Sequence, residues 1–342
     1  MSFQPQQQVD LRPFNTLGVS AKASYFTSVR IQPQLQAALR WAMENEQPWL
    51  LLGGGSNLVL AGDVDGLVIR LEMSGKRVVH EDDEHVWVRA QAGENWHELV
   101  RWTLEQGWSG LENLSLIPGT AGAAPVQNIG AYGVELKDVL EQVLVLDALD
   151  FGLKHLSVDE CQFGYRDSLF KREAGRRVIL SIDLRLRKQP QLQLDYGPIR
   201  AELERRSISQ PTPLDVSDAV IAIRQSKLPN PAELANAGSF FKNPIISAQQ
   251  AAELKKQFPD MVQYPLADGQ VKLAAGWLIE QAGWKGKCVG EAAVHEQQAL
   301  VLVNHGAASG TDVLALAEQI QADIKQRFAV ELEIEPLVIA DE

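Results

Sequence analysis

A run of glycines in the first third of the chain could bind phosphate. Gly53-Gly54-Gly55-Ser56-Asn57 follows the short apolar run 49–52. Backbone N–H groups in such a loop can converge on an anion, because glycine lets the chain approach the ligand closely. The loop matches neither the GxGxxG pattern of nicotinamide-binding proteins nor the GK[ST] of P-loops. Taken alone, these residues favour an ordinary turn over a phosphate site.

A second glycine-rich segment, residues 116–133, could hold a flat ligand. Its sequence, LIPGTAGAAPVQNIGAYG, contains four glycines and four alanines. Small side chains over this length would let an aromatic ring lie against the backbone. A tightly packed buried loop explains the same composition equally well, and the residues alone leave both interpretations open.

Three more residues have side chains that could act on a substrate. Arg166, in FGYRDS, could bind a carboxylate through both guanidinium nitrogens or form a surface ion pair with Asp167. Ser239, in NAGSFFKNP, lacks the GxSxG pattern of a hydrolase nucleophile, so the pattern favours a turn residue. Glu335 shares the parity of Glu333 in an alternating segment, which favours the solvated face of an edge strand.

The histidines and cysteines indicate no metal site. The six histidines form no HExxH pattern, and His80 and His85 bracket an acidic turn. Cys161 and Cys288 lie far apart without a CxxC pair, which excludes a disulfide framework or a cysteine-based zinc site. We therefore expect no bound metal and a reducing compartment.

The elements that must position these residues alternate between helical and strand patterns, which predicts an α+β or α/β organisation. The helices are expected at 34–47, 94–106, 215–225, 247–258, 271–282 and 311–328, a hairpin at 77–92, and strands at 49–52, 58–60, 66–69, 143–146, 178–182, 299–303 and 330–335. The polar segment 205–213 is typical of a connector, and we place a domain boundary near the proline-rich loop 227–231.

Composition narrows the function classes. The 342 residues suggest two or three domains, and 32 basic against 44 acidic residues give a formal net charge of −12. A nucleic-acid binder usually carries a basic balance, so that class is disfavoured. The N-terminus has no signal-peptide pattern, and no apolar run is long enough to span a membrane. These features predict a cytoplasmic protein.

Together the motifs resemble the type I UDP-N-acetylenolpyruvoylglucosamine reductases, flavoenzymes of bacterial peptidoglycan precursor synthesis. The segments GGGSN, IPGTAGAAPVQNIGAYG, FGYRDS, KLPNP, NAGSFFKNP and KLAAGWLIEQAGWKG occur in the order found in that family. The resemblance runs from Pro13 to the C-terminal strand. It implies an α+β protein whose FAD-binding fold is of the vanillyl-alcohol oxidase (PCMH-type) kind, with a smaller α/β substrate-binding domain. The implied domains are 1–73 plus 329–342 (FAD-binding subdomain 1), 74–226 (FAD-binding subdomain 2) and 227–328 (substrate-binding domain).

The resemblance also implies roles for single residues. The catalytic residues would be Arg166, Ser239 and Glu335. The residues that would bind FAD, tightly and non-covalently, are Gly53, Gly54, Gly55, Ser56, Asn57, Pro118, Gly119, Ala123, Gln127, Asn128, Ile129 and Gly130. The residues that would hold the substrate are Tyr196, Lys227, Asn243, Tyr264 and Gln298.

The reaction implied is the NADPH-dependent reduction of UDP-N-acetylglucosamine enolpyruvate to UDP-N-acetylmuramate by a monomer. A hydride would pass from NADPH to FAD and then to C3 of the enolpyruvyl ether. Arg166 would stabilise the growing negative charge, Glu335 would assist in its protonated form, and Ser239 would protonate C2.

Two positions depart from the family pattern. Gly54 stands where an acidic residue is frequent. Ile334 stands where proline is common, so Glu333 is the alternative to Glu335. A different flavin oxidase, or a non-catalytic module that kept the fold, would also fit parts of the sequence. Lys227, Asn243 and Tyr264 argue against the oxidase, and the presence of Arg166 and Ser239 argues against the non-catalytic module.

Overall fold

The computed structural model describes residues 3–340, and the contacts of the chain divide it into two compact units. The first unit contains the described residues up to 9 together with 23–55 and 65–226. The second contains 10–22, 56–64 and the described residues from 227 onward. Each unit is therefore built from segments that are distant in the sequence.

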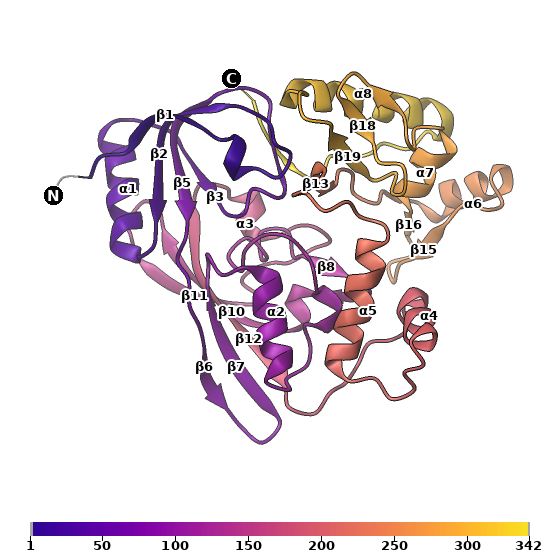
Figure 1. Ribbon diagram of the computed structural model, residues 1–342, viewed down its shortest axis with the longest axis horizontal. Helices are drawn as coiled ribbons and strands as arrows, with labels where there is room; N and C mark the ends of the chain where they lie inside the picture. Colours follow the sequence, from indigo (N-terminus) through magenta and orange to yellow (C-terminus); the bar gives the residue numbers. More distant parts are fainter. Residues whose placement is uncertain (1–2, 341–342) are drawn as a thin grey trace. The chain divides into compact units, whose positions relative to one another are not determined.

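A four-stranded sheet of the first unit leads into the glycine loop. Its strand order is β1-β2-β5-β3, with β1 (Gln6–Asp10), β2 (Lys22–Val29), β5 (Val64–Leu71) and β3 (Trp49–Leu52). Helix α1 (Gln32–Glu44) buries Leu35, Ala38, Leu39 and Ala42, the face expected from their helical spacing, and lies along this sheet (Figure 1). Because β3 pairs in parallel with β5, the glycine loop begins at the carboxyl end of a parallel strand.

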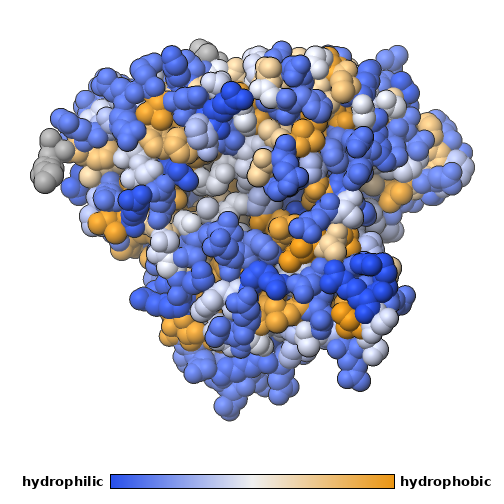
Figure 2. All heavy atoms as spheres, viewed as in Figure 1, coloured by the Kyte–Doolittle hydropathy of each residue, from blue (hydrophilic) through white to orange (hydrophobic). Residues whose placement is uncertain are grey.

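A five-stranded antiparallel sheet forms the rest of the framework of the first unit. Its order is β11-β10-β12-β7-β6, with β11 (Leu153–Ser157), β10 (Leu140–Asp147), β12 (Arg177–Arg187), β7 (His85–Gln91) and β6 (Lys76–Glu81). The predicted hairpin is confirmed as β6 and β7, and its acidic tip is hydrophilic in Figure 2. Helix α2 (Trp96–Glu105) begins at Asn95, whose side chain accepts a hydrogen bond from the Glu98 N–H.

The remaining helices of the first unit are α3 (Leu169–Arg172), α4 (Gly197–Arg205) and α5 (Pro213–Gln225). Helices α4 and α5 share a core of Ile199, Leu203, Val216, Val220 and Ile223. Helix α5 was expected at 215–225, whereas α4 was not predicted. Short strands β8 (Gly130–Ala131) and β9 (Val134–Glu135) and the 3-10 turns η2 (Glu112–Leu114) and η3 (Leu136–Asp138) complete this unit.

The second unit contains the 3-10 turn η1 (Arg12–Phe14) and small sheets covered by helices. One sheet has the order β13-β19-β18-β17, with β13 (Ala235–Ser239), β19 (Val301–Asn304), β18 (Ala292–Val294) and β17 (Cys288–Val289). Another has the order β14-β16-β15, with β14 (Ile245–Ile246), β16 (Val271–Leu273) and β15 (Gln263–Pro265). Strand β20 (Leu337–Ile339) pairs in parallel with β4 (Leu58–Leu60). The helices are α6 (Ala248–Gln257), α7 (Ala275–Gln281) and α8 (Gly310–Phe328).

Helix α8 shows how local sequence sets an element. Ser309 and Asp312 form a capping box at its start, and the buried face repeats at helical spacing as predicted. A side chain at Gly310 would place its Cβ only 1.8 Å from the Leu60 carbonyl oxygen, so glycine is required where the helix meets β4.

Two predicted elements were wrong in detail. The segment 271–282 is not one helix, because Val271 and Leu273 alternate with Lys272 and pair as β16 before α7 begins at Ala275. The segment 330–335 forms no strand beyond an isolated bridge at Ile334. Pro336, which has no N–H to donate, ends that pairing, and the last strand is β20.

The mixture of helices with mainly antiparallel sheets confirms the α+β class. Among residues 3–340, no helix is both long enough and apolar enough to cross a membrane. The division into three domains stays a prediction.

Candidate active site

The two glycine-rich segments of the first unit lie in contact. A Cβ added at Gly54 would lie 3.0 Å from the Gly119 Cα, and one added at Gly53 would lie 2.9 Å from the Thr120 Oγ1 and 3.6 Å from the Ala123 Cβ. The two backbones therefore approach as closely as glycine allows. A dinucleotide needs such a cradle of exposed backbone, so these residues fit the expected FAD.

The same contact accounts for the departure at Gly54. A larger side chain there would have to push the Gly119 backbone away by a few tenths of an ångström. An acidic residue at this position therefore needs a different spacing of the two loops.

The second loop is fixed by main-chain hydrogen bonds to the start of α2. Trp96 N–H donates to the Gly119 carbonyl oxygen at 3.1 Å, and Ala121 N–H donates to the Glu94 carbonyl oxygen at 2.9 Å. Three other predicted FAD residues, Pro118, Gln127 and Ile129, lie within this loop in the first unit. Gly55 closes the first-unit part of the glycine loop, whereas Ser56 and Asn57 belong to the second unit.

The Asn128 side chain is engaged within the protein. It is fully buried, donates to Glu135 Oε2 and to the Gly164 carbonyl oxygen at 3.1 Å each, and accepts from the Lys137 N–H at 3.1 Å. Its backbone lies in the left-handed region, with φ 42°, which asparagine tolerates better than most residues. This side chain thus joins the second loop to the turn that carries Arg166.

Arg166 occupies a constrained position. Its backbone is also left-handed, with φ 53°, an uncommon conformation that clusters at functional sites. The guanidinium Nη2 donates to the Gly130 carbonyl oxygen at 2.8 Å, and the guanidinium carbon lies 5.6 Å from the Tyr165 ring centroid. Asp167 forms an ion pair with Arg172. The turn thus directs Arg166 toward the second glycine-rich loop.

Arg224, which the sequence interpretation missed, lies near Arg166. Its Nε is buried without a hydrogen-bond partner among the described residues, and its guanidinium donates to the Tyr132 hydroxyl. Burial lowers the pKa of Arg224, and the positive charge of Arg166 lowers it as well. Burial also raises the pKa of Tyr132. Two arginines held together in this way favour an anion beside them.

Tyr196, a predicted substrate residue, belongs to the same cluster. Its ring makes an edge-to-face contact with Tyr132, with centroids 5.2 Å apart. The signal for Arg224 was present in the sequence: it lies four residues after the buried Val220 on α5, so a charged residue occupies the edge of an apolar face.

In the second unit, a β-bulge directly precedes Ser239. The register of β13 against β19 shifts between Asn236 and Ser239, and Gly238 adopts φ 72° within the bulge. Bulges of this kind redirect side chains next to active sites. Among the described residues, no hydrogen bond engages the half-buried Ser239 hydroxyl. The buried Phe240 and Phe241 anchor the chain directly after it.

The C-terminal segment returns to this point. The Glu335 N–H donates to the Phe240 carbonyl oxygen at 2.9 Å, and Ile334 bridges Phe241. Glu335 is half-buried, whereas the Glu333 side chain is 69% exposed and forms an ion pair with Lys242. The structure therefore brings Glu335 next to Ser239 and leaves Glu333 in an ion pair with Lys242.

The other predicted substrate residues of the second unit are polar and accessible to differing degrees. The Asn243 Oδ1 accepts from the Ala275 N–H at 2.9 Å at the start of α7, which leaves its amide N–H groups for a ligand. Tyr264 is 42% exposed on β15. The Gln298 Oε1 lies 3.4 Å from the Leu300 N–H nitrogen, and Lys227 is exposed. Within residues 3–340 there is no group of three or more histidine, cysteine or acidic side chains that could hold a metal ion.

Two segments of the chain match the models of known protein families. Residues 23–150 match the model of an FAD binding domain. Residues 230–339 match the model described as UDP-N-acetylenolpyruvoylglucosamine reductase, C-terminal domain.

Similar proteins cover nearly the whole chain. A UDP-N-acetylenolpyruvoylglucosamine reductase of Pseudomonas putida is 54% identical over 98% of this chain and 99% of the relative. One of Chromobacterium violaceum is 52% identical over 99% of this chain and 100% of the relative. The crystal structure of UDP-N-acetylenolpyruvylglucosamine reductase from Thermus caldophilus is 27% identical, with a TM-score of 0.69 over 97% of this chain and 98% of that chain.

Proposed function

The chain belongs to the UDP-N-acetylenolpyruvoylglucosamine reductase family, and from this we propose that it reduces UDP-N-acetylglucosamine enolpyruvate to UDP-N-acetylmuramate with FAD as its bound cofactor and NADPH as co-substrate. It is thus an FAD-dependent oxidoreductase of peptidoglycan precursor synthesis. When bound, FAD supplies the hydride, taken from NADPH, that adds to C3 of the enolpyruvyl group. The protein must hold the cofactor, stabilise the charge that develops on the substrate, and deliver a proton to C2.

The close approach of Gly53 and Gly54 to Gly119 supports FAD binding in the first unit. Backbone N–H groups at the end of β3 would hold the cofactor diphosphate without a cationic side chain. Ala123 and Gly130 belong to the same glycine-rich segment and present little side-chain bulk toward a flat ring.

Arg166 and Arg224 support charge stabilisation. Adding a hydride to C3 moves electron density from the double bond toward the substrate carboxylate. A guanidinium already fixed by the Gly130 carbonyl oxygen can stabilise that charge without reorganising. The buried Nε of Arg224, which has no partner among the described residues, can donate to the same anion.

The single observation that carries the proton-transfer step is the hydrogen bond between the Glu335 N–H and the Phe240 carbonyl oxygen. It holds Glu335 beside Ser239, whose hydroxyl is half-buried. We assign Ser239 as the proton donor to C2. Glu335 acts in its protonated form, because an ionised carboxylate would repel the developing negative charge. Tyr196, Lys227, Asn243, Tyr264 and Gln298 would hold the UDP-sugar.

The role of Ser239 is tested by separating the two half-reactions in Ser239→Ala. Under anaerobic conditions, NADPH should bleach the flavin absorbance of this variant as fast as that of the unchanged protein. Its formation of UDP-N-acetylmuramate from the enolpyruvyl substrate should slow by about 10²-fold or more, which is the usual contribution of a positioned acid. The exposed Ser20→Ala is the matched control and should leave both steps unchanged. Formation of UDP-N-acetylmuramate by Ser239→Ala at the normal rate would remove Ser239 from the mechanism.

A further inference from the structure

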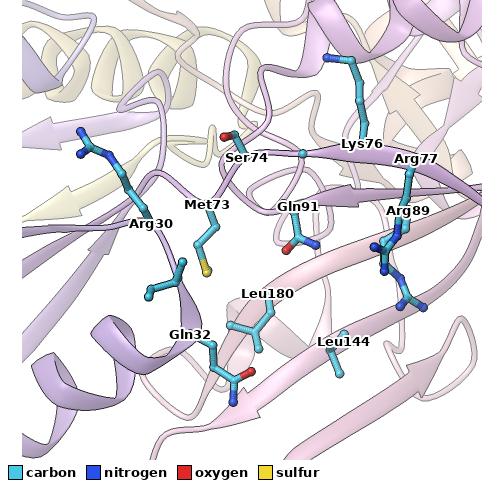
Figure 3. A pocket seen from close by; sticks show the side chains of 12 residues that line it. Arg30, Gln32, Met73, Ser74, Lys76, Arg77, Arg89, Gln91, Leu144 and Leu180 are labelled. Atoms are coloured by element: carbon cyan, nitrogen blue, oxygen red, sulfur yellow. The ribbon is translucent and has the colours of Figure 1, made fainter.

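A cavity of about 480 Å³ lies in the first unit, on residues that the proposed function does not use. Its lining includes four cationic residues, Arg30, Lys76, Arg77 and Arg89, and no carboxylate. Apolar side chains of Met73, Leu144 and Leu180 also line it (Figure 3). This size falls within the range of small-molecule sites. We call it the cationic pocket.

Most of the cations already have acidic partners outside the lining. Asp183 accepts from Arg89 Nε and Nη2 at 2.7 Å each, Glu94 pairs with Lys76 at 3.0 Å, and Glu72 pairs with Arg30 at 3.1 Å. Among residues 3–340, Arg77 forms no ion pair. The pocket therefore has one uncompensated guanidinium.

The position of Arg77 makes this charge unfavourable. Arg77 and Arg89 stand directly opposite each other on the antiparallel strands β6 and β7, and Figure 3 shows their side chains next to each other. Like charges in this register destabilise a sheet. Asp183, opposite Arg89 on β12, can neutralise one of the two arginines but not both. Arg77, Arg89 and Asp183 therefore form a row across the three strands that lacks one negative charge.

A second, independent observation lies beneath the pocket. Ser181 is 1% exposed, and its Oγ has no hydrogen-bond partner among the described residues. Its cross-strand neighbours are Gln91 on one side and Leu144 on the other, and both line the pocket. A buried hydroxyl without a partner is uncommon and indicates a missing polar ligand or water.

The start of helix α1 also favours an anion in the cationic pocket. Ile31 and Gln32 line the pocket, and the helix has no side-chain cap at Ile31. Pro33 has no N–H and the Gln34 N–H donates to the Ile31 carbonyl oxygen, so the Gln32 N–H and the dipole of this helix of 13 residues are what favour an anion there.

From these observations we propose that the cationic pocket binds a small phosphate ester, with the phosphate at Arg77 and Arg89 and the apolar part of the ester over Met73, Leu144 and Leu180. A phosphate fits because guanidinium groups bind it with two parallel hydrogen bonds. A phosphate also supplies the negative charge that the Arg77–Arg89–Asp183 row lacks. This site is independent of the FAD and UDP-sugar residues.

The test is calorimetric titration of the FAD-loaded protein with phenyl phosphate, inorganic phosphate and phenol. We expect phenyl phosphate to bind more tightly than inorganic phosphate, and phenol not to bind. Arg77→Gln should weaken phenyl phosphate binding at least about tenfold, the usual effect of losing a charged hydrogen-bond donor. Arg77 is exposed, so this variant should fold normally.

Two further variants decide between outcomes. Arg185→Gln, on β12 and outside the lining, is the matched control and should keep the affinity. Lys227→Gln removes a cation of the proposed UDP-sugar site. Loss of binding in Lys227→Gln but not in Arg77→Gln would place the phosphate in that other site and overturn the proposal. Absence of phenyl phosphate binding, or equal binding of phenol, would overturn it as well.

Discussion

At the scale of single residues, several residues have backbone conformations or buried polar atoms that cost folding free energy. Arg166 and Asn128 both have positive φ, and Arg224 buries a guanidinium nitrogen that has no partner among the described residues. Each such feature costs about 1–3 kcal/mol and persists only where the surroundings enforce it. Their concentration around the second glycine-rich loop is the expected mark of a binding site.

Gly54 gives a direct test of the proposed FAD cradle. In Gly54→Ala the new Cβ would meet the Gly119 Cα at 3.0 Å and force the two loops apart. Overpacking of this kind costs about 1–3 kcal/mol, so FAD should bind roughly tenfold more weakly. The measurement is the FAD content after dialysis, followed by titration of the depleted protein with FAD.

Gly197→Ala is the matched control for this experiment. No atom lies within 4 Å of a Cβ added at Gly197, and this variant should retain its FAD. Unchanged FAD affinity in Gly54→Ala would show that the contact with Gly119 is not part of the cofactor site.

At the scale of elements, Asn128 holds together three segments of the chain, one of which is the turn that carries Arg166. Its side chain contacts Glu135 of β9, the Lys137 N–H of the turn η3, and Gly164 in the turn that bears Arg166. Because β8 supplies the Gly130 carbonyl oxygen that accepts from Arg166, Asn128 acts as a positioning residue for that guanidinium. Its effect on catalysis should therefore pass through Arg166.

We expect Asn128→Ala to slow substrate reduction more than flavin reduction by NADPH, and to lower kcat more than it raises KM. Stopped-flow measurement of the two half-reactions checks this. Asn15→Ala is a matched control, because Asn15 is also buried and makes three comparable hydrogen bonds, to Leu11 and Val19. Asn15→Ala should lower stability without separating the half-reactions. An equal slowing of both steps in Asn128→Ala would leave it a purely structural role.

Elements whose signal is local could be predicted from sequence. The periodic faces of α1 and α8 and the β6–β7 hairpin are all defined by residues close in the chain. The errors came where distant partners decide. β16 is a strand because β14 and β15 flank it, and residues 330–335 fail to form one because Pro336 stops the pairing begun at Phe241.

The residues of the candidate site also differ in how far their own sequence surroundings reveal them. The glycine-rich loops and Arg166 are recognisable as motifs. The pattern around Glu335 favoured a solvated strand face, and only the resemblance to the reductase family indicated a catalytic role. Arg224 was missed because its place at the edge of an apolar helix face does not show that the distant Tyr132 and Arg166 approach it.

At the scale of the whole molecule, the net charge of −12 disfavours nucleic acid but does not prevent anion binding. FAD, NADPH and the UDP-sugar are all anionic. The groups that would bind them are backbone N–H groups and the side chains of a few arginines and lysines. Fixed backbone dipoles and buried cations determine anion binding at short range, whereas the surplus of acidic residues sets the net negative charge of the molecule.

The most direct measurement is an anaerobic cycle on the purified, unmodified protein. It should be yellow, NADPH should bleach the flavin absorbance, and UDP-N-acetylglucosamine enolpyruvate should restore it with one UDP-N-acetylmuramate formed for each flavin reoxidised. A colourless protein that takes up no FAD, or a bleached flavin that oxygen restores but the enolpyruvyl substrate does not, would contradict the proposed function.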